Sequence, residues 1–148
     1  MVISRILLCI GLAAGSLSTY DTLSHAWDPS YQAPRLALGA THTNYHAFRE
    51  FMLEVGAAIT MLYVIFKAPS RRNHSLWIVM AITAVFYYGG WWLPGPLLGL
   101  HTPNRLAAID HVIASVFSLA GIAMAYPHFA VGTLSNDLKG SNESSSLK

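Results

Sequence analysis

Residues 42–54 read His-Thr-Asn-Tyr-His-Ala-Phe-Arg-Glu-Phe-Met-Leu-Glu, and residues 55–66 continue without a break as an almost wholly apolar run. In one helix, His42, His46, Glu50 and Glu54 recur at every fourth position, so their side chains line a single face. This stripe is predicted to begin near a membrane surface and to bring Glu54 close to the middle of the bilayer. An ionisable group at that depth costs several kcal/mol unless it faces a partner or a wet cavity. The stripe is therefore the first candidate for a functional site.

Composition indicates what kind of chain carries this stretch. Of 148 residues, 53% are hydrophobic and only 11% are charged, whereas roughly a quarter are charged in an average soluble domain. The length allows one domain, and the composition predicts a membrane protein. The formal net charge of +2 is small and no basic stripe is present, which argues against nucleic acid as a partner.

Four apolar segments are predicted to cross a membrane as helices, at about residues 3–20, 43–66, 75–93 and 106–126. Each is close to the length that a spanning helix requires. The first segment has an alternative interpretation as a cleaved signal peptide, because Arg5 precedes it and small residues occupy positions 13–16. We predict an all-α fold, a four-transmembrane-helix up-down bundle over residues 1–133, with a disordered polar tail at 134–148.

The connections between these segments differ in character. Residues 21–41 contain the turn sequence Trp27-Asp28-Pro29-Ser30 and are predicted to form an interfacial loop. Residues 94–103 are rich in proline and glycine, so an irregular connection is expected there.

Lysine and arginine predict the orientation of a multi-pass integral membrane protein. One side would hold Arg5, Lys67, Arg71, Arg72, Lys139 and Lys148. The other side would hold only Arg35 and Arg105, with Arg49 inside a helix. Because cytoplasmic loops carry the excess of positive charge, both termini are predicted to face the cytoplasm.

In this orientation, ionisable residues from three predicted spans gather on the non-cytoplasmic side. The predicted acid–base residues are Glu50, Glu54, His46, Asp110 and His111. The residues predicted to surround a ligand are Asp21, His25, Arg49, Tyr87, Tyr88, Trp91, Trp92 and Arg105. The leading hypothesis is a pocket that binds a small lipophilic molecule. A carboxyl group buried in a membrane holds its proton more tightly, so Glu50 or Glu54 beside His46 could also isomerise or cyclise that molecule.

Two further classes of function stay open, and a third is less favoured. Imidazoles and carboxylates on one helix face could bind zinc, iron or copper, through His42, His46, Glu50 and His111. This would suit a membrane oxidoreductase or an accessory subunit, although the Glu-x-x-His and His-Glu-x-x-His motifs are missing. A structural subunit of a membrane complex is the other class, since Gly11, Ala14 and Gly15 would let helices approach closely. Ion passage is less favoured, because the cytoplasmic halves of the spans contain no matching polar row.

Several candidate residues also have purely structural interpretations. His42 could be a solvated residue at the start of its helix, and Asp110 could cap or charge the start of the fourth span. The aromatic cluster at residues 87–92 is typical of a membrane interface. Glu54 is the hardest residue to explain in this way.

Several features resemble the small DoxX-like four-helix membrane proteins: four short spans, the His-Ala-Trp-Asp-Pro sequence at 25–29, histidines opening the second span, and Asp110-His111. The resemblance covers roughly residues 3–126 and implies a four-helix bundle. A weaker resemblance is to the emopamil-binding sterol isomerases, where His and acidic residues in a membrane bundle act on a lipophilic amine or sterol. His46-x-x-x-Glu50 is similar to the pairing used there, but the chain has additional histidines and lacks a clear counterpart for the remaining acidic residues.

The expected partners follow from these hypotheses. They are membrane lipid, a small lipophilic molecule, and either another membrane protein or a second copy of the chain. No cofactor is predicted apart from the transition metal of the alternative hypothesis.

Overall fold

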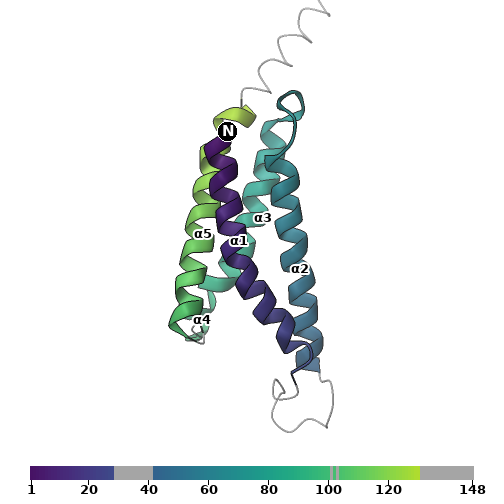
Figure 1. Ribbon diagram of the computed structural model, residues 1–148, viewed down its shortest axis with the longest axis vertical. Helices are drawn as coiled ribbons and strands as arrows, with labels where there is room; N and C mark the ends of the chain where they lie inside the picture. Colours follow the sequence, from purple (N-terminus) through teal and green to yellow (C-terminus); the bar gives the residue numbers. More distant parts are fainter. Residues whose placement is uncertain (29–41, 101, 103, 131–148) are drawn as a thin grey trace, which may run out of the picture.

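The computed structural model describes residues 1–28, 42–100, 102 and 104–130, with the side chain of His42 outside the description. Over these ranges the chain is helical and contains no strand, which confirms the predicted all-α class. The long helices are α1 (Val2–His25), α2 (His42–Ile65), α3 (His74–Trp92) and α5 (Arg105–Ala125). Figure 1 shows that they lie side by side and that successive helices run in opposite directions.

Two short helices join the long ones. A 3₁₀ turn, η1 (Pro69–Arg71), lies between α2 and α3, and α4 (Pro94–Leu98) lies between α3 and α5. The connection predicted to be irregular therefore contains one helical turn. It stops at Gly99, whose φ of 68° is left-handed and suits glycine. The predicted loop at 21–41 is wrong for residues 21–25, which continue α1. Residues 29–41 of that loop and the predicted tail at 134–148 lie outside the described residues.

Asparagine side chains begin two of the long helices. Asn73 accepts a hydrogen bond from the backbone N–H of Leu76, and Asn104 accepts one from Ala107, each at 2.9 Å. Each cap satisfies one of the backbone donors that a helix start leaves unpaired, and contributes about 1 kcal/mol.

Three helices in the described part of the chain are long and apolar enough to cross a membrane. They are Val2–His25, His74–Trp92 and Arg105–Ala130. The helix α2 is not among them, because it carries Arg49, Glu50 and Glu54. Three of the four predicted spans therefore have the length and apolar character of a membrane helix, and the most polar helix is the one with the candidate site.

The closest helix contact is between α1 and α5. A Cβ atom added to Gly121 would lie 2.7 Å from the carbonyl oxygen of Ser4 and 2.8 Å from the backbone nitrogen of Leu8. A Cβ atom added to Gly11 would lie 2.6 Å from the backbone nitrogen of Ser118. Only glycine fits at these two positions, so the small residues of both helices set the register between them.

The first helix changes partner along its length. Figure 1 shows α1 lying beside α5 near the N-terminus and reaching α2 at its far end. There the buried side chain of Asn44 donates to the carbonyl oxygens of His25 and Asp28, at 2.8 and 3.1 Å. Because α1 continues to His25, Asp21 and His25 lie one turn apart on a helix, and their side chains approach to 3.9 Å.

Candidate functional site

Glu54 lies on the buried stripe of α2. It follows Ala47 and precedes Met61 at intervals of seven residues, and all three are buried. With 6% of its surface exposed, it is the only buried carboxylate among the described residues. Neighbouring Glu50, one turn earlier, is exposed. An ionisable group therefore occupies a position where helix packing normally favours an apolar side chain.

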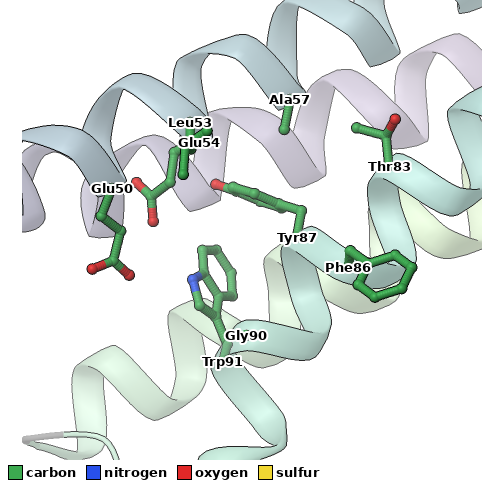
Figure 2. Close-up of a pocket in the computed structure, with 9 residues that line it drawn as sticks. All are labelled: Glu50, Leu53, Glu54, Ala57, Thr83, Phe86, Tyr87, Gly90 and Trp91. Carbon is green, nitrogen blue, oxygen red and sulfur yellow. The ribbon is translucent and has the colours of Figure 1, made fainter. Parts of the chain in front are cut away.

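Side chains from α1 and α3 surround the Glu54 carboxyl group. It interacts with the hydroxyl group of Thr19 and the indole of Trp91. The Thr19 and Tyr87 hydroxyl oxygens lie 3.5 Å apart. Figure 2 shows the Glu54 carboxyl group facing Tyr87 and Trp91. Its Oε2 atom has no hydrogen-bond partner among the described residues, so the carboxyl group is only partly satisfied.

Trp91 also contacts His111 of α5, so one indole joins two buried ionisable groups, Glu54 and His111. The two rings stack with centroids 4.2 Å apart and planes inclined at 18°. The imidazole is 9% exposed, and a 2.9 Å hydrogen bond joins its Nε2 to the hydroxyl of Ser18 on α1. Within the described residues its Nδ1 atom is buried without a partner. Glu54, Trp91 and His111 thus form a continuous polar and aromatic path between α2 and α5.

A groove of about 390 Å³ opens beside Glu54, between α2 and α3. Its lining residues are Glu50, Leu53, Glu54, Ala57, Thr83, Phe86, Tyr87, Gly90 and Trp91. Leu53 and Phe86 are 63% and 79% exposed. The groove therefore combines a buried carboxyl group, aromatic walls and an apolar rim.

Other predicted residues of α2 lie outside this groove. The exposed side chains of His46 and Arg49 line a separate hollow of about 250 Å³. Glu50 and Leu53 line both this hollow and the groove. His46 lies on the outer surface near the start of α2, so the structure does not bring it to Glu54.

Asp110 faces a different part of the molecule from His111. It lines a hollow of about 230 Å³ between α1 and α5, together with Asp21, Ser18 and Asn104. Consecutive residues on a helix point about 100° apart, so the side chains of Asp110 and His111 leave α5 in different directions, although their charges still interact. Arg105, at the start of α5, is exposed and lies in neither cavity.

The predicted ligand-binding aromatic residues divide into two groups. Tyr87 and Trp91 line the groove, as described. Tyr88 is buried in the core and donates to the Ser118 hydroxyl at 2.6 Å. Trp92 donates to the Ser115 hydroxyl at 3.2 Å and lines a hollow of about 360 Å³ next to α4. Residues 88 and 92 therefore have hydrogen-bonding roles in helix packing.

The metal alternative finds no support among the described side chains. These contain no group of three His, Cys, Asp or Glu residues arranged to hold a metal ion. Because the side chain of His42 lies outside the description, a set that includes it stays a prediction.

Asp21 and His25 of α1 were predicted, but two further residues of that helix were missed. Ser18 binds His111 and Thr19 contacts the Glu54 carboxyl group. The signal was available in the spacing, because Ser18 follows the buried residues Ser4, Gly11 and Gly15 of α1 at helical intervals.

No protein-family model, curated protein or solved structure matches this chain. The resemblances to DoxX-like proteins and to sterol isomerases therefore stay predictions. Support for a function comes from the geometry around Glu54 and from the apolar character of the helices.

Proposed function

We propose that the chain is a multi-pass membrane protein in which α1, α2, α3 and α5 form a four-span bundle that binds a small lipophilic ligand. The length and apolarity of α1, α3 and α5 support three of the spans. The helix α2 runs alongside α1 and α3 (Figure 1), and its second half, 55–65, is apolar. The nitrogen of Met1 lies 2.7 Å from His128 Nε2, so the start of α1 lies beside the turn that follows α5, which suits an even number of spans between them.

The observation that carries the proposed ligand site is the buried, partly satisfied carboxyl group of Glu54 at the wall of a 390 Å³ groove. A buried polar atom without a partner costs about 1–3 kcal/mol. A ligand with a hydrogen-bond donor would remove that penalty, and its apolar body would pack on Tyr87, Trp91 and Phe86. The favoured ligand is therefore lipophilic, with one polar group.

The rim of the groove favours access from the lipid. Leu53 and Phe86 are exposed on either side, and an added Cβ atom on Gly90 would meet no atom within 4 Å. In a membrane these apolar side chains would face hydrocarbon, so a lipophilic ligand would reach Glu54 sideways from the bilayer. A water-soluble ligand would have to cross an apolar rim first.

The burial of Glu54 also supports a proton-carrying role. Removal from water disfavours the ionised form of a carboxyl group, and only 6% of the Glu54 surface is exposed. This burial suits neutral Glu54. Neutral Glu54 could deliver a proton to a bound molecule and, once ionised, remove one, as an isomerisation or cyclisation requires.

Ligand binding is tested by purifying the protein in a mild detergent and identifying retained small molecules by organic extraction and mass spectrometry. Wild-type protein should retain a lipophilic molecule, and Glu54→Gln should retain at least about tenfold less, since one good polar contact is worth about 1.4 kcal/mol. Asp21→Asn, which removes a carboxylate from the other hollow, should match wild type. Equal retention by Glu54→Gln, or no retained molecule in wild type, would contradict the proposal.

The proton-carrying role has a test that needs no ligand. Lipid-soluble dicyclohexylcarbodiimide reacts with protonated carboxyl groups in apolar surroundings. Peptide mass spectrometry should find the adduct on Glu54 and not on exposed Glu50, whereas a water-soluble carbodiimide with an added amine should modify Glu50. Absence of the adduct from Glu54 under conditions that keep the protein folded would argue against a neutral carboxylic acid at that position.

A further inference from the structure

Charge is segregated along the helices. The end of the molecule that holds the start of α1 and the η1 turn carries Arg5, Lys67, Arg71 and Arg72, which we call the basic end. Four of the five acidic residues of the described chain lie nearer the opposite end, and Glu54 lies at the middle of α2; the four are Asp21, Asp28, Glu50 and Asp110. The basic end therefore has no carboxylate among the described residues to balance its charge.

Arg72 is the most unusual member of the basic end, because only 7% of its surface is exposed. Its Nε donates to the carbonyl oxygen of Lys67 at 2.9 Å, and its guanidinium carbon lies 5.8 Å from the Phe129 ring centroid. Burial and the charge of Arg5 both lower the pKa of Arg72. An arginine stays charged even so, and a buried cation requires a compensating anion.

Arg5 lies close enough to Arg72 for their charges to interact, and it is held in a similar way. Its Nε donates to the carbonyl oxygen of Ile65 at 3.2 Å, and its guanidinium carbon lies 4.9 Å from the Phe66 ring centroid. Backbone carbonyls at the end of α2 and its connection thus orient both guanidinium groups. Within the described residues neither forms an ion pair with a carboxylate.

We propose that the basic end binds the phosphate group of an anionic phospholipid. Guanidinium groups match phosphate oxygens in geometry and charge, and two of them held close together without a carboxylate provide a site for one phosphate. Exposed Ile3, Ile6 and Phe66 lie beside them and would contact the acyl chains. This inference shares the membrane placement of the proposed function but does not depend on the groove.

The test uses the full chain in lipid nanodiscs made of phosphatidylcholine, with or without about one-fifth phosphatidylglycerol. Native mass spectrometry counts the lipids that stay bound after release into detergent. Wild-type protein should retain phosphatidylglycerol in preference to phosphatidylcholine. Arg5→Gln and Arg72→Gln should each reduce that preference by about fivefold, the effect of removing one cation near an anionic surface.

Matched variants separate a site from general charge attraction. Arg105→Gln removes an exposed cation at the opposite end and should keep the wild-type preference, as should Asp21→Asn, which removes an exposed carboxylate there. If Arg72→Gln does not fold, Arg5→Gln carries the test alone, because Arg5 is only partly buried.

Three results would overturn the inference. The first is a wild-type protein that does not prefer phosphatidylglycerol, and the second is a loss of that preference in Arg105→Gln as large as in Arg5→Gln. The third is displacement of phosphatidylglycerol by inorganic phosphate at a concentration about equal to that of the lipid, which would indicate a site for free phosphate. The groove is tested separately, by the retention of co-purified molecules in Glu54→Gln. Failure of that test would leave the prediction about phosphatidylglycerol unchanged.

Discussion

The α1–α5 contact and the α2–α3 contact use the same residue type for opposite purposes. Gly11 and Gly121 bring two backbones so close that an added Cβ atom would lie within 2.8 Å of backbone atoms. Around Gly56 and Gly90, on α2 and α3, an added Cβ atom would meet no atom within 4 Å. Glycine therefore allows close approach in one region. In the other region Gly90 leaves space at the groove that it lines, and Gly56 lies outside that groove.

This difference in packing distinguishes the α1–α5 contact, which supports the fold, from the groove between α2 and α3, which is the candidate site. Close packing of small residues holds membrane helices together when lipid offers no hydrophobic driving force between them. Ligand cavities lie where packing is incomplete and a few polar groups converge. In this chain the tight contact lies between α1 and α5 and the groove lies between α2 and α3, so each region can be altered separately.

Substitution of Gly121 by Ala should have the largest effect. Its Cβ atom would approach the backbone of Ser4 and Leu8, which cannot rotate away, so α1 and α5 must separate. We expect a loss of about 2–3 kcal/mol in the free energy of unfolding, typical of overpacking, measured with a denaturing detergent. Gly56→Ala is the control and should stabilise α2 by about 0.5–1 kcal/mol. Equal effects at both positions would mean that the two contacts do not differ.

Filling the mouth of the groove should weaken binding without lowering stability. Gly90→Leu adds a side chain where no atom lies within 4 Å of the Cβ position, so its bulk should block the path to Glu54. Retention of the co-purified molecule should fall by about tenfold, the equivalent of 1.4 kcal/mol. Gly56→Leu does not line the groove and should leave retention unchanged. Normal retention in Gly90→Leu would place the ligand elsewhere.

The smallest expected difference is in the free energy of unfolding of two adjacent variants, Tyr87→Phe and Tyr88→Phe. Tyr88→Phe removes a buried 2.6 Å hydrogen bond to Ser118, a residue of the α1–α5 contact, and should cost about 1 kcal/mol of unfolding free energy. Tyr87→Phe removes only a 3.5 Å contact at the groove and should cost about 0.5 kcal/mol or less. The comparison fails if Tyr87→Phe is the more destabilising of the two in the same unfolding titration.

Much of the helical class could be predicted, because long apolar runs and proline-rich breaks are local properties of the sequence. The extension of α1 to His25 was missed, since the polar residues after Tyr20 look like a loop although their backbone continues the helix. The different directions of the Asp110 and His111 side chains follow from the angle between consecutive residues on one helix. These outcomes depend only on local geometry.

Assembly of the site depends on helix register, which no single segment encodes. Glu54 could be identified from its depth in an apolar run, but its contact with Thr19 and Trp91 depends on how α1 sits against its neighbours. Gly11 and Gly121 fix part of that register through backbone contacts. Their effect becomes visible only when both helices are placed together.

The pairing of α1 with α5 has a consequence for biosynthesis. The ribosome completes the first helix long before the last, so the face of α1 that carries Ser4, Gly11 and Gly15 has to wait for its partner. Helices that contact each other only after nearly the whole chain is made form a late, non-local step of folding. A nascent chain that ends before residue 105 lacks α5 altogether, and should be a preferred target for membrane quality-control proteases.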